Sequence, residues 1–138
     1  MDQGAYSPNI LLIEASRMSQ LIVKFFFIGL GCRLHMASNG WEALKKIDED
    51  LFDIILIATK LPDIDGFTIA SMVRQNSQYS SKTPIIALSN KADNAEREKA
   101  TKAGMDDYFI MPLSESTCQN ILEKYAPGTS TSGGFATT

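Results

Sequence analysis

Hydrophobic residues fall along the chain in two alternating patterns, short continuous runs and longer stretches at helical spacing. The runs are four or five residues long, as expected for strands that are buried on both faces of a sheet. One further stretch alternates, with Leu34 and Met36 between Arg33 and His35, which is typical of a half-exposed edge strand. Strands are therefore predicted at residues 10–13, 32–37, 54–58, 85–88 and 108–111.

Each predicted strand is followed by a segment with the features of a helix. Ser16 can cap the first helix, and apolar residues recur at helical spacing until Gly29 and Gly31 end it. The later helices are expected around residues 43–47, 67–73, 94–103 and 121–125. Strands that alternate with helices in this way predict an α/β fold, with a parallel sheet covered by helices on both faces.

The length of the chain fits one domain. It has 138 residues, of which 44% are hydrophobic, and this is enough for a full core without disulfides or metals. The periodic pattern covers residues 9–126, and residues 1–8 precede it as an N-terminal extension. Residues 127–138 are mainly Gly, Ser and Thr, which predicts a flexible tail or linker.

Composition argues against several classes of function. The net charge is −3 and the basic residues are scattered, so direct binding to nucleic acid is not expected. The longest apolar stretch, residues 21–30, contains Lys24 and is too short to span a membrane. Cys32 and Cys118 lie far apart with no secretory signal, which predicts reduced, space-filling thiols and a cytoplasmic location.

A ligand site is expected at the carboxyl ends of the strands, where open parallel sheets bind ligands. Among the residues that follow the strands, only Glu14 is charged. One carboxylate is a poor ligand set for Mg²⁺, and the only histidine, His35, falls on an outer strand, away from any serine nucleophile. No catalytic residue, metal site or cofactor is therefore predicted.

Several segments, in this order, resemble the receiver domains of response regulators in two-component signalling. They cover residues 10–19, 37–44, 61–67, 83–89 and 103–108. The resemblance implies a flavodoxin-like (βα)5 fold with sheet order 2-1-3-4-5. It also implies that an aspartate ending the third strand accepts a phosphoryl group from a kinase histidine, with Mg²⁺ held by acidic residues after the first strand.

Carried over to this sequence, the resemblance places altered residues at the chemical positions. Ala58 stands at the phosphoacceptor position, Glu14 and Ala15 at the acidic pair, and Met111 at the lysine that grips the phosphoryl oxygens. Alanine has no lone pair to attack phosphorus, and a thioether has no positive charge to stabilise an oxyanion. We therefore expect Mg²⁺ binding to be weak or absent.

Other positions of the family pattern are kept. Ser89 matches the hydroxyl position, although it can equally be a simple hydrogen-bonding residue at a strand end, which we favour. Tyr108 matches the aromatic residue that rotates on activation. Pro112 matches the proline whose preceding peptide bond is usually cis, so a cis Met111–Pro112 bond is predicted.

These features favour a phosphorylation-independent binding module, or pseudo-receiver. Its expected partners are a histidine kinase, a phosphotransfer protein or an output domain, and a homodimer is left open. The alternative is an ordinary phospho-accepting receiver of a response regulator or hybrid histidine kinase, with Ala58 as an introduced substitution. Departures at Ala15 and Met111 argue for natural loss. A flavin-binding flavodoxin-like protein is disfavoured because no phosphate-cradling loop follows the first strand.

The first helix carries more apolar residues than one face can bury. Only Arg17, Gln20 and Lys24 form a polar stripe on its helical wheel. Either the helix is well covered by its neighbours or part of it binds a partner, and the candidate partner surface is Phe25, Phe27 and Ile28. In contrast, the charged helix at residues 94–103 is interpreted as a solvated face.

Overall fold

The computed structural model describes residues 7–76, 79 and 83–127. Strands and helices alternate as predicted, with boundaries that differ by a few residues. In chain order the elements are β1 (Asn9–Ile13), α1 (Arg17–Gly29), β2 (Arg33–Ala37), α2 (Gly40–Glu49), β3 (Ile54–Ala58), α3 (Gly66–Gln75), β4 (Ile85–Ser89), α4 (Asn94–Lys102), β5 (Asp107–Ile110) and α5 (Glu115–Tyr125).

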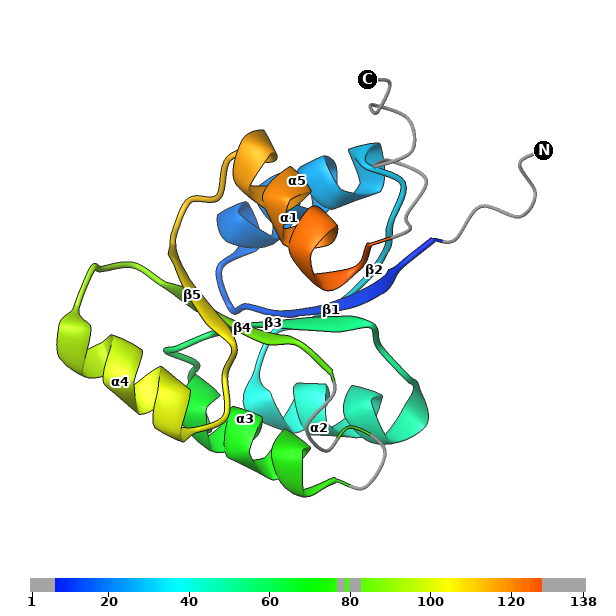
Figure 1. Cartoon of the computed structure of the whole chain (residues 1–138). Helices are drawn as coiled ribbons and strands as arrows, with labels where there is room; N and C mark the ends of the chain where they lie inside the picture. Colours follow the sequence, from blue (N-terminus) through cyan, green and yellow to red (C-terminus); the bar gives the residue numbers. More distant parts are fainter. Residues whose placement is uncertain (1–6, 77–78, 80–82, 128–138) are drawn as a thin grey trace.

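The strands form one parallel sheet in the order β2-β1-β3-β4-β5, which confirms the predicted topology. Helices α1 and α5 cover one face, and α2, α3 and α4 cover the other (Figure 1). Because every strand runs in the same direction, all the carboxyl ends meet at one edge. That edge carries the residues that follow β1, β3, β4 and β5.

The core is divided by the sheet into two clusters. Alternate residues of the central strands point to opposite faces, so Leu11 and Ile13 pack with α2, α3 and α4, whereas Ile10 and Leu12 pack with α1 and α5. Strands β1, β3 and β4 are buried along their whole length. The continuous apolar runs in the sequence therefore reflect a sheet covered on both sides.

Helix α1 begins where predicted, and the Ser16 side chain accepts a hydrogen bond from the Ser19 amide at 3.2 Å. Gly31, just beyond the helix, has a φ of +90°, a conformation that side chains with a Cβ rarely adopt. The chain can therefore turn directly into β2.

The structure corrects two predictions for α1. Phe27, expected on the partner surface, is fully buried between the helix and the sheet, and Gln20, expected on the polar stripe, is buried as well. Gln20 donates hydrogen bonds to the Glu14 carbonyl oxygen at 2.6 Å and to Ser38 Oγ at 3.1 Å. Phe25 and Ile28 are exposed as predicted, at 75% and 47%.

The reason for the correction is helical geometry. Residues two positions apart lie about 200° apart around a helix axis, so Phe25 and Phe27 point in nearly opposite directions. Only one of them can face solvent once the other packs on the sheet. The apolar excess is therefore shared between the core and the surface.

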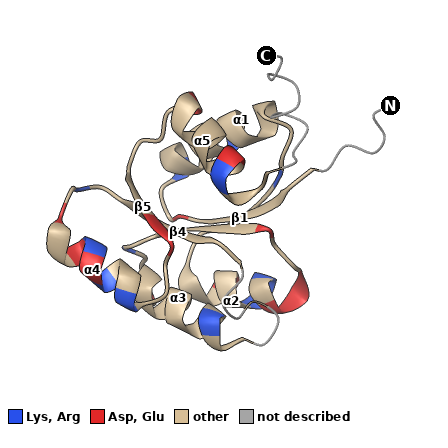
Figure 2. Cartoon of the chain, viewed as in Figure 1, with Lys and Arg blue, Asp and Glu red and all other residues tan. Residues whose placement is uncertain are grey.

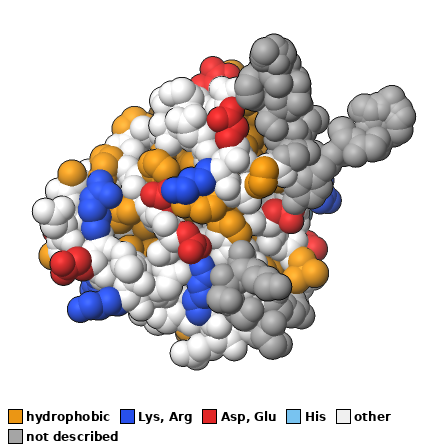
Figure 3. Space-filling view, in the orientation of Figure 1, with side chains coloured by type: hydrophobic (Ala, Val, Ile, Leu, Met, Phe, Trp, Pro, Cys, Tyr) orange, Lys and Arg blue, Asp and Glu red, His pale blue; other side chains and the backbone are white. Residues whose placement is uncertain are grey.

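The remaining sequence predictions concern the chain ends, the thiols and the charges. Apart from Ser7, Pro8 and Pro127, the N-terminal extension and the tail lie outside the described residues. Cys32 and Cys118 are free and buried, and within the described part of the chain no helix is long and apolar enough to cross a membrane. Basic and acidic residues alternate along α4 (Figure 2), and both signs are interspersed on the face seen in Figure 3.

Candidate functional site

The residues predicted to lie at the site do meet at one edge of the sheet. Ala58 ends β3 beside Leu88 of β4, and Ser89 ends β4 opposite Ile110 of β5. Ala58 and Ser89 are both buried. At the carboxyl ends of these strands, a small cavity is lined by Thr59, Ser89 and Glu96, among others, and the strand that precedes Thr59 ends in the methyl group of Ala58.

Helix α3 starts close to the end of β3. The Gly66 amide donates a hydrogen bond to the Thr59 carbonyl oxygen at 3.1 Å, and a Cβ at Gly66 would collide with the Ala58 carbonyl oxygen. The backbone can approach so closely only because residue 66 is glycine. This contact holds the loop after β3 in place without any help from the Ala58 side chain.

Glu14 brings a carboxylate to the loop that follows β1. It is buried and accepts a hydrogen bond from the Ser16 amide at 2.8 Å. One of its carboxylate oxygens therefore already has a hydrogen-bond partner within the loop. Ala15 is exposed and brings no oxygen ligand. Among the described residues, no three His, Cys, Asp or Glu side chains converge in a way that could hold a metal ion. The donor set does not fit Mg²⁺, which prefers several oxygen ligands.

Calorimetric titration with Mg²⁺ is expected to give no saturable heat at submillimolar concentrations, because no group of three His, Cys, Asp or Glu side chains among the described residues could hold the ion. The matched control is the double variant Ala15→Asp, Ala58→Asp, which adds two carboxylates and is expected to gain binding. Tight, stoichiometric binding to the unmodified protein would contradict this prediction.

Met111, at the position matched to the family lysine, contributes to hydrophobic packing. Met111 is partly buried and packs against the cluster formed with α1 and α5. Its amide donates a hydrogen bond to the Ser89 carbonyl oxygen at 2.7 Å. The Met111–Pro112 peptide bond is cis, which confirms the prediction made from the sequence.

A residue that the sequence analysis missed occupies the other side of the pocket. Glu96, in the first turn of α4, turns its carboxylate towards the strand ends, where Oε1 accepts a hydrogen bond from Ser89 Oγ. The Tyr108 hydroxyl lies 2.6 Å from the same oxygen, and Thr59 Oγ1 lies 3.4 Å from it. Hydroxyl groups from the ends of β3 and β4 and from Tyr108 of β5 therefore converge on one carboxylate.

The environment of Glu96 favours its charged form. Partial burial raises the pKa of this carboxyl, but hydrogen bonds from Ser89 and Tyr108, with the nearby Lys91 ammonium, outweigh burial, so the pKa lies below its ordinary value. Burial, and then the hydrogen bond to Glu96, raise the pKa of the Tyr108 hydroxyl. Glu96 is therefore an anion at neutral pH, and Tyr108 is a neutral donor.

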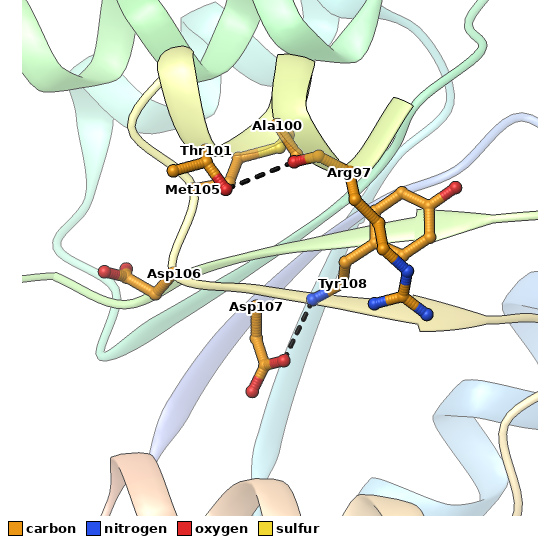
Figure 4. A pocket seen from close by; sticks show the side chains of 7 residues that line it. All are labelled: Arg97, Ala100, Thr101, Met105, Asp106, Asp107 and Tyr108. Atoms are coloured by element: carbon orange, nitrogen blue, oxygen red, sulfur yellow. Dashed lines mark hydrogen bonds between the residues drawn. The ribbon is translucent and has the colours of Figure 1, made fainter. Parts of the chain in front are cut away.

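Tyr108 is held from a second direction. The Arg97 guanidinium lies over its ring, 4.6 Å from the centroid, a distance suited to a cation–π contact. Both residues line a pocket of about 260 Å³ between α4 and β5 (Figure 4). The interpretation of α4 as a solvated face holds for the exposed residues Arg97, Glu98 and Lys99 and fails for Glu96, which binds residues of the sheet.

Two aspartates in the loop between β3 and α3 have structural roles. Asp65 caps α3 by accepting a hydrogen bond from the Thr68 amide at 2.8 Å. Asp63 also accepts from the Gly40 amide at 2.8 Å and the Trp41 amide at 3.0 Å. It therefore caps the start of α2, which is distant in sequence.

Helix α1 carries a second candidate site. Its exposed large apolar side chains follow one another at intervals of three and four residues, and we call them the α1 stripe: Met18, Leu21, Phe25 and Ile28. Such spacing places them on one narrow face. Lys24 and Gly29 flank a shallow depression along the same face.

Comparison with known proteins identifies the family. The model for the response regulator receiver domain matches residues 10–123. The chain belongs to this family. The match covers every strand and helix of the receiver domain except the first residue of β1 and the last two residues of α5.

Curated relatives of this receiver domain include large multidomain proteins. Hybrid signal transduction histidine kinase G of Dictyostelium discoideum is 33% identical over 121 residues, which are 86% of this chain and 4% of that protein. Signal transduction histidine-protein kinase BarA of Escherichia coli K12 is 31% identical over 136 residues, 99% of this chain and 15% of that protein. The chain thus spans a small part of these relatives.

Solved structures agree with the receiver fold. The receiver domain of sensor histidine kinase PA1611 from Pseudomonas aeruginosa PAO1, which has a magnesium ion coordinated in its active site cleft, has a TM-score of 0.79 and 29% identity. The similarity covers 87% of this chain and 98% of the PA1611 receiver domain. Chemotaxis response regulator CheY4 of Vibrio cholerae has a TM-score of 0.81 at 24% identity, with 87% and 99% covered.

Proposed function

We propose that this receiver domain is a protein-interaction module that binds its partners without being phosphorylated. The observation that carries the proposal is the end of β3, where a buried Ala58 methyl group stands at the place matched to the phosphoacceptor. No side chain there can attack phosphorus. The packing of Met111 into the apolar core also supports the loss, because it removes the positive charge that would stabilise a phosphoryl oxyanion.

The proposed partner is helical, and the α1 stripe is the proposed contact. Side chains at alternating intervals of three and four residues are the arrangement by which one α-helix packs along another. Relatives of this chain are histidine kinases, and a helical kinase domain or phosphotransfer domain offers such a surface. We therefore propose that the stripe lies against a helix of one of these proteins.

Phosphorylation is the direct test. After incubation with acetyl phosphate and Mg²⁺, intact mass measurement is expected to give an unchanged mass, because no nucleophile ends β3. The restoring variant Ala15→Asp, Ala58→Asp, Met111→Lys replaces all the altered positions, and we expect it to gain the mass of one phosphoryl group. Its urea unfolding curve checks that it is folded.

Two outcomes would contradict the proposal. A gain of mass by the unmodified protein would mean that another residue accepts the phosphoryl group. Full phosphorylation of the single variant Ala58→Asp would instead favour the alternative of an ordinary receiver, since Ala15 and Met111 would then be compatible with the chemistry.

A further inference from the structure

The surroundings of Glu96 are those of an anion site. One carboxylate oxygen lies within reach of the Ser89, Tyr108 and Thr59 hydroxyl groups, and hydrogen bonds to an ionised acceptor are stronger than those between neutral groups. Lys60 and Lys91 line the same small cavity, of about 70 Å³. The donors and the positive charges would suit a small oxyanion, and a side chain of the protein occupies the place.

The site also joins three elements of the fold. Glu96 belongs to the first turn of α4, which Asp93 caps by accepting a hydrogen bond from the Ala95 amide at 2.9 Å. Ser89 ends β4, and Tyr108 lies in β5. A single carboxylate therefore ties α4 to both strands.

Tyr108 has two acceptors but one proton. Its hydroxyl lies 2.6 Å from Glu96 Oε1 and 2.8 Å from the Lys91 carbonyl oxygen, and it can donate to only one at a time. Both acceptors lie towards the strand-end pocket, so the hydroxyl is turned inward. Removal of the Glu96 carboxylate would leave a neutral carbonyl as the remaining acceptor and would weaken this orientation.

We propose that Glu96 is the built-in ligand of an oxyanion site formed by the ends of β3 and β4 together with Tyr108 of β5, and that it holds Tyr108 and the first turn of α4 in one conformation. The proposal deepens the proposed function and rests on it in one respect, that no phosphoryl group is added to this pocket. The Glu96 carboxylate would then be a permanent anion in the pocket where a receiver that is phosphorylated gains the negative charge of a phosphoryl group.

The test follows the environment of Tyr108 by fluorine NMR. The chain has four tyrosines, so after labelling with 3-fluorotyrosine the variant Tyr108→Phe identifies the relevant signal by its loss. In Glu96→Ala we expect the Tyr108 signal to shift and broaden. The matched control is Glu98→Gln, which removes an exposed carboxylate from the same helix and is expected to leave the signal in place.

Restoration by a free anion tests the nature of the site. Sodium acetate, titrated into Glu96→Ala at constant ionic strength, is expected to return the Tyr108 signal towards its original position, whereas chloride is not. An unchanged signal in Glu96→Ala would overturn the proposal. A changed signal that acetate cannot move would overturn it as well.

A measurement on the unmodified protein keeps the proposal testable if Glu96→Ala does not fold. The charged and titratable groups around Glu96 are Lys60, Lys91, Arg97, Asp93 and Tyr108. As the pH falls through the pKa of Glu96, below the ordinary glutamate value, the carboxyl gains a proton and accepts less well. The Tyr108 signal is therefore expected to titrate together with the Glu96 side-chain carbon.

A Tyr108 signal that stays constant through the titration of Glu96 would overturn the inference. This failure differs from a failure of the proposed function. A gain of phosphoryl mass would overturn the proposed function but leave the contact between Glu96 and Tyr108 standing, because the NMR signal is recorded on protein that has never met a phosphoryl donor.

Discussion

Replacing Phe27 with alanine is expected to lower the free energy of unfolding by about 3–5 kcal/mol, the usual cost of removing a buried aromatic ring. Phe27 is fully buried in the cluster between the sheet and α1 and α5. Domains of this kind have a free energy of unfolding of about 5–15 kcal/mol. The Phe27→Ala substitution would therefore remove a large share of the stability of the domain. Urea unfolding, followed by circular dichroism, measures this loss of stability. The urea concentration at the midpoint should fall, with little change in the dependence of the unfolding free energy on urea concentration.

The matched control is Phe25→Ala, the same substitution two residues earlier. Phe25 is 75% exposed, so its loss leaves no cavity, and the free energy of unfolding is expected to change by no more than about 0.5 kcal/mol. Equal losses in the two variants would mean that both rings are core, and the assignment of Phe25 to a binding surface would fail.

Polar replacement within the α1 stripe is expected to weaken partner binding while the free energy of unfolding stays within about half a kcal/mol. The variants are Phe25→Ser and Ile28→Glu, both at exposed positions. Burial of one such side chain at an interface contributes about 1.5–3 kcal/mol, so each loss should weaken binding by roughly 10-fold to 100-fold. Isothermal calorimetry against kinase bundle domains and phosphotransfer domains of the same organism measures the effect, and sedimentation measures self-association.

Leu51→Ser provides the control for this series. Leu51 is exposed at 62% and belongs to the loop between α2 and β3, not to α1. Its replacement is expected to leave binding unchanged. If Leu51→Ser weakened binding as much as Phe25→Ser, the contact would be a general hydrophobic one and not specific to the α1 stripe.

The sequence predicted the elements of this fold well because its signals are local. The run at residues 54–58 is apolar throughout and bounded by polar residues, as is typical of a strand covered on both faces. Ser16 and Gly31 mark the ends of α1 because a cap and a positive φ depend on single residue types. The receiver motifs then gave the sheet order.

The sequence was a weaker guide to which apolar residues of α1 are buried. Hydrophobicity alone does not distinguish Phe25 from Phe27, because both lie in a continuous apolar segment. The orientation of the helix on the sheet decides between them, and that orientation depends on contacts with α5 and the strands. Gln20 is buried for the same reason, since two polar acceptors happen to lie beneath it.

Glu96 shows most clearly what a linear pattern leaves out. In the sequence it is one charged residue among many in the segment 94–103 and stands three residues after the cap Asp93, where a glutamate usually serves its own helix.

The sequence by itself thus determined the strands, the helices, the family and the alanine at the end of β3. The tertiary structure alone decided that Phe27 belongs to the core and that Glu96 meets Ser89 and Tyr108. The physical reason is that a strand or a cap is specified by neighbours in the chain, whereas a helix face and the reach of a long side chain are specified by neighbours in space.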